Sequence, residues 1–314
     1  MPVLAKIGGC IWMLFLAAVP MCAQPDSHTI HMEVVHDRPY VMVEINGQGP
    51  FRFLIDTGTG AQAIVTDELA GLLHLPTIGH TRLTDTSGLG EQRSDTVLIE
   101  SLHLAGAEFT GVRAIRHRLY GEDDTCLGLL GFTLFKDYML TLDYPNQRMT
   151  LSGGSLNAGD STVIPFRMPD GVPIAFLQVG DQRVEALFDS AGTGLSLPKQ
   201  LAAKLKFASD PLPYGNVESV STRFQIMAAK LGSNIRLGQY TFDHPFVEIN
   251  PAFPLVNFGS CPMQIFSITF DQAHLLVRLR ANQKTLHLAE TPVKVILQNA
   301  PNPKPPNPML VPVG

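Results

Sequence analysis

Two aspartates stand directly behind apolar runs, and their side chains could share a proton. Asp56 follows Phe53-Leu54-Ile55, and Asp189 follows Leu187-Phe188. A lone carboxyl group behind a buried strand is costly to bury, whereas two carboxyl groups that meet can hold one proton between them. One of them then accepts a proton from a bound water while the other donates its proton to a carbonyl oxygen. The pair therefore indicates general acid–base chemistry without a covalent intermediate.

The two aspartates occupy the same place in an internal repeat, which is the main organisational feature of the chain. Residues 39–58 read PYVMVEINGQGPFRFLIDTG, and residues 173–192 read PIAFLQVGDQRVEALFDSAG. In both copies, alternating apolar residues and a turn containing Gly predict a β-hairpin that ends at the Asp. A Gly followed by Asp twelve residues later recurs in segments 131–143 and 259–271. Short strands and turns outnumber helix-like stretches, which predicts an all-β fold.

Further motifs in the two copies carry a family resemblance. The first copy, lobe one, contains Asp56-Thr57-Gly58 and Leu129-Leu130-Gly131, while lobe two contains Asp189-Ser190 and the more degenerate Asn257-Phe258-Gly259. Over residues 30–280 the chain resembles the retropepsin-like aspartic peptidases of bacterial type, with two lobes in tandem in a single chain. The resemblance implies two pseudo-twofold-related, closed β-barrel lobes of retropepsin or pepsin type, with an active-site cleft between them.

The resemblance also implies roles for individual residues. The implied catalytic pair is Asp56 and Asp189. The residues implied to support this pair are Thr57, Gly58, Thr59 and Ser190, of which Thr57 and Ser190 tie the lobes together. The implied flap, which closes over the substrate, consists of Ser87, Gly88, Leu89 and Gly90. Because Thr59 offers a hydroxyl to Asp56 and Gly192 offers Asp189 only its backbone, we expect the shared proton to reside mostly on Asp189.

Lobe two departs from the family pattern directly after its aspartate. Ala191 stands between Ser190 and Gly192, where the family has Gly next to Ser or Thr. A methyl group at this point could obstruct the substrate or require a φ that Ala disfavours. The sequence thus predicts an aspartic endopeptidase, a hydrolase that cuts peptide bonds, and leaves one alternative open. That alternative is a catalytically silent, peptidase-like module that binds peptides.

Other classes of protein find little support in the sequence. The segment from Gly58 to Ala63 matches the pattern GxGxxA of dinucleotide-binding folds, but no βαβ unit follows it. The chain has no Lys/Arg run typical of nucleic-acid binding and neither HExxH nor CxxC, and its formal charge is −5 over 314 residues. We therefore expect a peptide or protein substrate, no metal, no cofactor and no nucleic acid. Because both aspartates are in one chain, we expect a monomer.

The two ends of the chain differ in composition from the repeats. Lys6 followed by an apolar stretch and Ala23 is typical of a signal peptide, which predicts a secreted or periplasmic protein without a stable membrane span in its mature form. Pro20-Met21 disfavours a lipid anchor at Cys22. The expected division is a signal peptide (1–23), an N-terminal peptidase lobe (24–151), a linker (152–160), a C-terminal peptidase lobe (161–290) and a Pro-rich tail (291–314).

Two other residue pairs leave alternatives open. Cys126 and Cys261 would remain after signal removal, either as one disulfide or as two thiols. Asp143 and Asp271 also recur in the repeat, but each stands next to a turn, so a structural role is expected for both.

Overall fold

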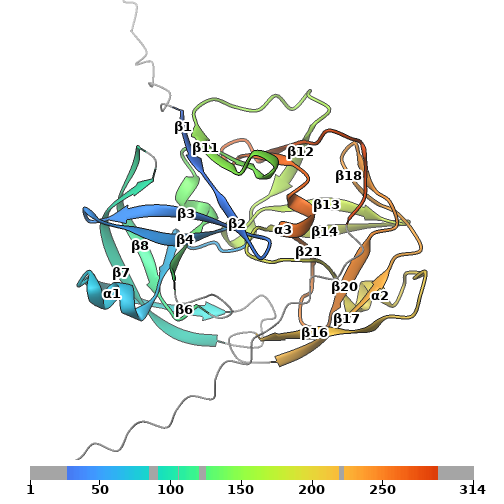
Figure 1. Cartoon of the computed structure of the whole chain (residues 1–314), viewed down its shortest axis with the longest axis horizontal. Coiled ribbons are helices and arrows are strands. Elements are labelled where there is room, and N and C mark those ends of the chain that lie inside the picture. The colour runs from blue at the N-terminus through green and yellow to red at the C-terminus, as the bar shows by residue number, and fades with distance from the viewer. Residues whose placement is uncertain (1–26, 85–90, 105, 120–124, 219–222, 289–314) are drawn as a thin grey trace, which may run out of the picture.

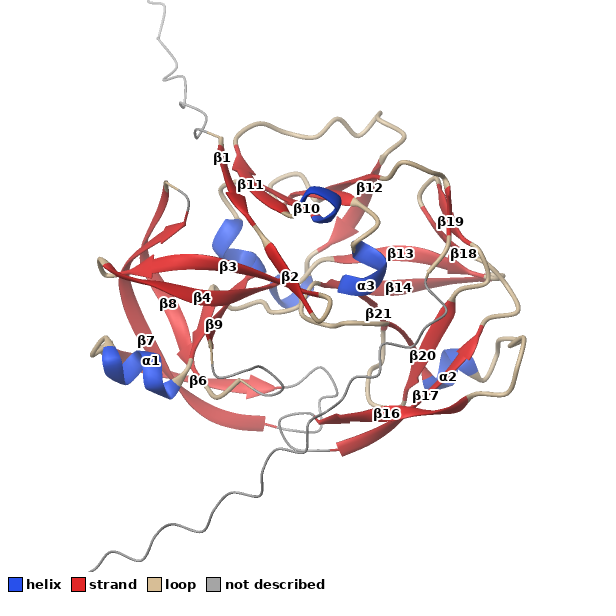
Figure 2. Ribbon diagram, viewed as in Figure 1, coloured by secondary structure: helices blue, strands red, loops and turns tan. Residues whose placement is uncertain are grey.

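The computed structural model describes residues 27–84, 91–104, 106–119, 125–218 and 223–288. The expected signal peptide (1–23) and Pro-rich tail (291–314) lie outside these residues. Within them, strands dominate, and the α-helices are three short ones, α1 (Asp67–Leu72), α2 (Lys199–Ala202) and α3 (Ser260–Met263). No helix in the described ranges has the length and apolar character needed to cross a membrane. The fold is therefore nearly all-β, as predicted (Figure 2).

The eight strands of lobe one form one sheet, coloured blue to green in Figure 1. They are β2 (Glu33–Val35), β3 (Arg38–Ile45), β4 (Gln48–Asp56), β5 (Ala63–Val65), β6 (Thr77–Thr84), β7 (Glu91–Leu104), β8 (Ala107–Arg116) and β9 (Cys126–Gly131). Their order in the sheet is β2-β3-β4-β9-β5-β8-β7-β6, and β3 also pairs with β7. This extra pairing links strands from opposite parts of the sheet, although a fully closed barrel stays a prediction.

Lobe two repeats these pairings. Its strands are β12 (Val163–Arg167), β13 (Ile174–Val179), β14 (Gln182–Asp189), β15 (Leu195–Pro198), β16 (Leu212–Glu218), β17 (Arg223–Lys230), β18 (Ile235–Leu237), β19 (Tyr240–Phe242), β20 (Phe246–Asn250), β21 (Val256–Gly259) and β24 (Thr285–Leu286). β14 is parallel to β21 as β4 is to β9, and β15 is parallel to β20 as β5 is to β8. The predicted duplication of one β-rich unit is therefore confirmed.

Six strands that continue the sheet of lobe two through β12 join the lobes. Their order is β1 (His28–His31), β11 (Arg148–Ser152), β10 (Met139–Asp143), β22 (Ser267–Asp271), β23 (Leu276–Arg280) and then β12. At their centre Thr141 pairs with Thr269, and the two hydroxyl oxygens lie 2.9 Å apart. Since the register is symmetric about this pair, a pseudo-twofold axis passes through it and relates the two copies.

Aromatic side chains continue the contact between the lobes below these strands. The rings of Phe132 and Phe270 pack edge to face with centroids 5.1 Å apart, and Phe188 packs on both Phe270 and Phe258. All four side chains are fully buried. Such pairs contribute roughly 0.5–1.5 kcal/mol each beyond their buried area. Because Phe188 directly precedes Asp189, this packing fixes the strand end that carries the second aspartate.

Candidate active site

Asp56 and Asp189 are the last residues of equivalent strands, β4 and β14. Each lies opposite the glycine of the neighbouring parallel strand, Gly131 in β9 and Gly259 in β21. The residue before each aspartate, Ile55 or Phe188, is fully buried, whereas both aspartates are partly exposed. The apolar strand therefore anchors each carboxyl group at the point where the chain leaves the core.

Reciprocal hydrogen bonds between Thr57 and Ser190 join the two strand ends. The Thr57 amide donates to Ser190 Oγ (2.9 Å), and the Ser190 amide donates to Thr57 Oγ1 (3.0 Å). Each hydroxyl also donates to a carbonyl oxygen of the other lobe, Thr57 to Phe188 and Ser190 to Ile55, both at 2.7 Å. Neither residue is exposed to solvent. This network holds the chain next to each aspartate against the other lobe.

Both carboxyl groups lie against Gly58. Its amide donates to Asp56 Oδ1 (2.8 Å). A Cβ built on Gly58 would lie 2.7 Å from both Cγ and Oδ1 of Asp189, closer than non-bonded atoms approach. The absence of a side chain at Gly58 thus leaves the room that the Asp189 carboxyl group occupies. The structure brings the two predicted aspartates together at this residue.

Asp189 is held by several donors and is nevertheless protonated more readily than an ordinary Asp. Its Oδ1 accepts from the amides of Ala191 (3.1 Å) and Gly192 (2.9 Å). Burial raises its pKa, and this effect outweighs these amides, the side-chain hydrogen bond from Asn257 and the charge of Arg38, all of which lower the pKa. A raised pKa of Asp189 is the direction expected if the shared proton resides mostly on Asp189. Its main cause is burial, and not the difference between Thr59 and Gly192 on which the expectation rested.

Thr59 does not orient Asp56 in the expected way. Its amide lies 3.4 Å from the Asp56 carbonyl oxygen, and among the described residues its hydroxyl makes no hydrogen bond to the Asp56 carboxyl group. Its methyl group instead packs where a side chain on Gly131 would stand. Thr59 therefore fills space between the loop after Asp56 and Gly131, and the amide of Gly58 donates to Asp56.

Ala191 fits its position without strain. It is not among the described residues with positive φ, so the backbone places no demand for glycine on it. Its amide bonds Asp189 as that of Gly58 bonds Asp56. The methyl group packs on the cluster of Tyr40, Leu54 and Cys126. The expected conflict between Ala191 and the backbone is thus absent.

The glycine of each later motif is required by a close approach of the backbone. The Gly131 amide donates to Gln62 O (2.9 Å), and the Gly259 amide donates to Gly194 O (3.0 Å). A Cβ on either glycine would collide with a backbone carbonyl oxygen of the loop after the aspartate. Lobe two therefore keeps the essential residue of a motif that looks degenerate in sequence.

Two residues of the site were missed in the sequence. Asn257 occupies the first position of the Asn257-Phe258-Gly259 motif, where lobe one has Leu129, and its side chain hydrogen-bonds to Asp189. Its polarity at this position was the available signal. Arg38, in β3, donates from Nε to Ala191 O (2.9 Å) across the lobes. No motif marks Arg38, because its partner is 153 positions away.

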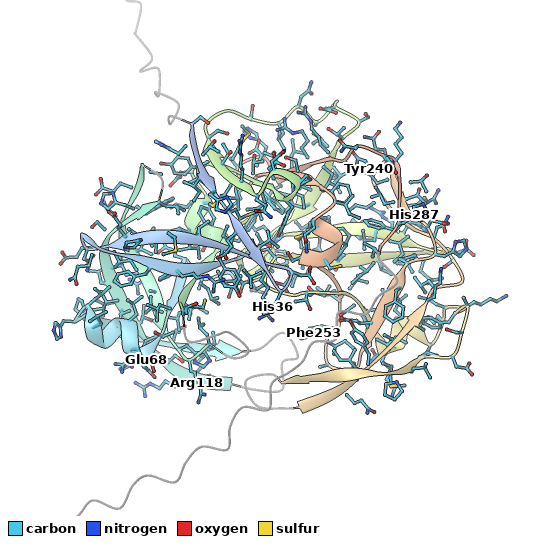
Figure 3. The ribbon with its side chains drawn as sticks, viewed as in Figure 1. His36, Glu68, Arg118, Tyr240, Phe253 and His287 are labelled. Carbon is cyan, nitrogen blue, oxygen red and sulfur yellow. The ribbon has the colours of Figure 1, made fainter. Side chains whose placement is uncertain are left out.

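A cavity of about 60 Å³ adjoins the second aspartate. Its walls are Leu187, Asp189, Asn257 and the segment from Phe253 to Val256. In the view of Figure 3, Phe253 appears in the region between the two lobes. The lining is mostly apolar, so the cavity suits a side chain or part of one beside the Asp189 carboxyl group.

The remaining candidate residues lie elsewhere or play other parts. The expected flap residues Ser87, Gly88, Leu89 and Gly90 lie outside the described residues. Cys126 and Cys261 remain thiols and form no disulfide within the described chain. Asp271 is buried and accepts from the amides of Leu156 (2.9 Å) and His274 (3.1 Å), which is a structural contact with the linker region.

In the described ranges, His, Cys, Asp and Glu side chains form no group of three or more that could hold a metal ion.

A known protein family matches both lobes of the chain. The family described as "Aspartyl protease" matches residues 41–134 and 175–266, one match in each lobe. Among solved structures, a retropepsin-like aspartic protease from Rickettsia conorii is similar, with 20% sequence identity and a TM-score of 0.31 over 42% of this chain and 97% of that chain. No curated protein matches the chain. Because the family matches occupy more than half of the sequence, the chain belongs to the aspartyl protease family, with two copies of the family unit in tandem.

Proposed function

We propose that the chain is an aspartic endopeptidase in which Asp56 and Asp189 activate water between the two lobes. The observation that carries the proposal is the meeting of both carboxyl groups at Gly58, held there by the Thr57–Ser190 network. Membership of the aspartyl protease family supports a hydrolase that acts on peptide bonds. We further infer that one chain suffices, because it supplies both carboxyl groups.

The environment of each aspartate suggests its part in the reaction. Asp189, whose pKa is raised by burial, starts as the acid, and Asp56 starts as the anion. Water attacks the peptide carbonyl carbon and gives a proton to Asp56, while Asp189 gives its proton to the carbonyl oxygen. The resulting diol collapses as the C–N bond breaks: Asp56 passes its proton to the leaving nitrogen, and one hydroxyl of the diol returns a proton to Asp189 as the new carboxyl group forms. The two aspartates thus exchange protonation states in the first step and regain their starting states in the second.

Replacing either aspartate tests the proposal. Asp56→Asn and Asp189→Asn should each lower kcat/KM on an unfolded protein substrate by roughly 10³-fold or more, and the double variant should be little worse, because the pair acts as a unit. Asp143→Asn is the matched control and should retain activity. Mixing the two single variants should restore nothing if one chain is the active unit.

Several outcomes would contradict the proposal. Activity that survives in Asp189→Asn would point to pairing of two lobe-one units instead. A folded wild-type chain that binds peptides and a pepstatin-type inhibitor but never cleaves would support the alternative of a silent binding module.

Export is the remaining part of the proposal. It rests on the pattern of residues 1–23. N-terminal sequencing of the mature protein should find Gln24 first, and an intact N-terminus in the exported fraction would contradict cleavage there.

A further inference from the structure

Four neighbouring strands of lobe two place a row of side chains beside Asp189. The register puts Leu187 of β14 opposite Asn257 of β21, Asn257 opposite Ser196 of β15, and Ser196 opposite Glu248 of β20. Residues that are paired across strands project from the same face of a sheet. The Ser196 hydroxyl accordingly donates to the Glu248 carboxyl group. The row runs from an apolar residue at its first position to an acidic residue at its last.

Lobe one has an apolar row in the same place. The register there joins Leu54 of β4 to Leu129 of β9, Leu129 to Ile64 of β5, and Ile64 to Ile115 of β8. The pairings are the same as those in lobe two, so the positions correspond one to one. Three apolar positions of lobe one are therefore Asn, Ser and Glu in lobe two.

The row lies on the face that carries the active-site cavity. Leu187 and Asn257, its first two members, line the cavity together with Asp189. Leu195 and Leu197, the neighbours of Ser196 in β15, are buried in the core on the opposite face. Glu248 is two strands beyond Asn257, which places it about 10 Å away at the usual spacing of strands. This separation is within the reach of a peptide bound at the aspartates.

The loop after Asp189 gives a second measure of this closeness. A Cβ built on Gly192 would collide with the Asp189 carboxyl group, and one built on Gly194 would collide with the Glu248 carboxyl group. Residues two apart in one loop thus touch the two carboxyl groups. Glu248 is therefore adjacent to the catalytic loop and not on a remote surface of the lobe.

The acceptors of this row have few donors: Asn257 Oδ1 has none among the described residues, and the Glu248 carboxyl group has one. Within the described part of the chain, the only hydrogen-bond partner of the Glu248 carboxyl group is the Ser196 hydroxyl, and no Lys, Arg or His side chain pairs with it. The Asn257 side chain is 94% buried, and its Oδ1 has no partner among the described residues. Burial raises the pKa of Glu248, while Ser196 opposes the rise. Buried acceptors without donors are unfavourable unless a ligand supplies the donors.

The surroundings of Glu248 suit a long side chain with a charged end. Tyr214 lies near it, since the Glu248 charge contributes to raising the pKa of Tyr214 to about 12, after burial as the main cause. The Tyr214 ring packs on that of Phe246, two residues before Glu248 in β20, with centroids 5.9 Å apart. The aromatic rings can pack on the methylene chain of a bound Lys or Arg side chain, and the Glu248 carboxyl group can pair with the positive charge at its end.

We propose that Glu248 selects substrates that carry a Lys or Arg side chain close to the scissile bond on the side of lobe two, with Ser196 orienting the carboxyl group and Asn257 Oδ1 offering a further acceptor. The proposal rests on the proposed peptidase function and names its substrate class. An extended peptide projects alternate side chains to one side at about 6.6–7 Å intervals. The side chain that meets Glu248 thus belongs to a residue one or two positions from the cleaved bond.

Matched peptides test the selection. Peptides that differ only in Arg, norleucine or Glu at one position would be compared over three positions on either side of the cleaved bond. At one position, wild-type kcat/KM should be roughly 10- to 100-fold higher for Arg than for norleucine, as expected for a hydrogen bond to a charged group. In Glu248→Ile, which installs the residue of lobe one, this ratio should fall to about one, and Glu248→Gln should lie between. The exposed Glu44→Gln is the matched control and should keep the full ratio.

Binding separates failure of this inference from failure of the proposed function. The affinity of Asp56→Asn for the Arg and norleucine peptides would be measured by fluorescence anisotropy, with and without Glu248→Ile. Absence of cleavage in the wild type together with a preference for Arg that Glu248→Ile removes would uphold the selection and reject hydrolysis. Cleavage or binding with no preference for Arg, or a preference that persists in both folded Glu248 variants, would overturn the selection.

Discussion

The two lobes share one arrangement of strands but differ in the side chains that they place around their aspartates. Lobe one surrounds Asp56 with Gly58 and an apolar row, whereas lobe two surrounds Asp189 with Ala191 and the polar row that ends at Glu248. The Thr57–Ser190 bonds, by contrast, are reciprocal. The backbone and the hydroxyls at the pseudo-twofold axis are thus common to both copies, while the side chains that face the cleft have diverged. We therefore expect the proposed peptidase site to treat the two ends of a substrate differently.

The largest difference in activity between variants of the two lobes should appear at the residue after Thr57 or Ser190, which is Gly58 in lobe one and Ala191 in lobe two. Gly58→Ala places a Cβ 2.7 Å from the Asp189 carboxyl carbon, so one of the two groups must move. A displacement of about 1 Å at the reacting groups costs on the order of 10²-fold in rate. We expect kcat/KM to fall by roughly 10²- to 10³-fold while the far-UV circular dichroism remains unchanged.

Ala191→Gly is the matched control in lobe two. It removes a methyl group that already has room in the structure and packs on Tyr40 and Leu54. Activity should remain within a few-fold of the wild type. Equal losses in the two variants would show that the lobes are equivalent at this position.

The second prediction concerns the part that the lobes share. Thr57→Ala and Ser190→Ala each remove two buried hydrogen bonds across the lobes and leave an amide and a carbonyl without partners. Each should lower the free energy of unfolding by about 2 kcal/mol in urea titration, and the two losses should agree within about 1 kcal/mol. Thr57→Ser and Ser190→Thr keep the hydroxyl and should cost less than about 1 kcal/mol. A loss confined to one of the alanine variants would mean that the network is not reciprocal.

The sequence was sufficient for the features that repeat. The spacing of Asp56 and Asp189 within the two copies predicted equivalent strand ends, and the structure has them in β4 and β14. The pairing of Thr57 with Ser190 followed from the family resemblance. Repetition makes these features visible, because a duplicated unit must bury the same face and turn at the same places.

The features that break the repeat were predicted less well. The unfavourable φ considered for Ala191 is absent, which could not be known before the fold was, while obstruction of a substrate by its methyl group stays a prediction. The expected hydrogen bond from the Thr59 hydroxyl to the Asp56 carboxyl group is absent among the described residues. The conformation of the short loop after Asp56 brings the Gly58 amide to that carboxyl group instead, and the sequence alone does not reveal this conformation. Asn257 and Glu248 were missed because their importance depends on register across strands that are far apart in the sequence. Pairwise contacts of this kind leave no local pattern.

The smallest expected effect is a shift of pH dependence in lobe two alone. Asn257→Leu installs the residue that lobe one has at this position, Leu129, and removes a donor that favours the ionised form of Asp189. The pKa of Asp189 should therefore rise further. Because Asp189 is the acid in the proposed mechanism, loss of its proton should end activity on the alkaline side, so the alkaline limb of kcat/KM should move to higher pH. A hydrogen bond worth about 1 kcal/mol corresponds to roughly 0.7 pH unit.

Thr59→Ala is the control, since the Thr59 hydroxyl makes no hydrogen bond to Asp56 within the described residues, and this variant should leave the acid limb in place. An alkaline limb that stays put or moves to lower pH in a folded, active Asn257→Leu variant would show that Asn257 does not tune Asp189.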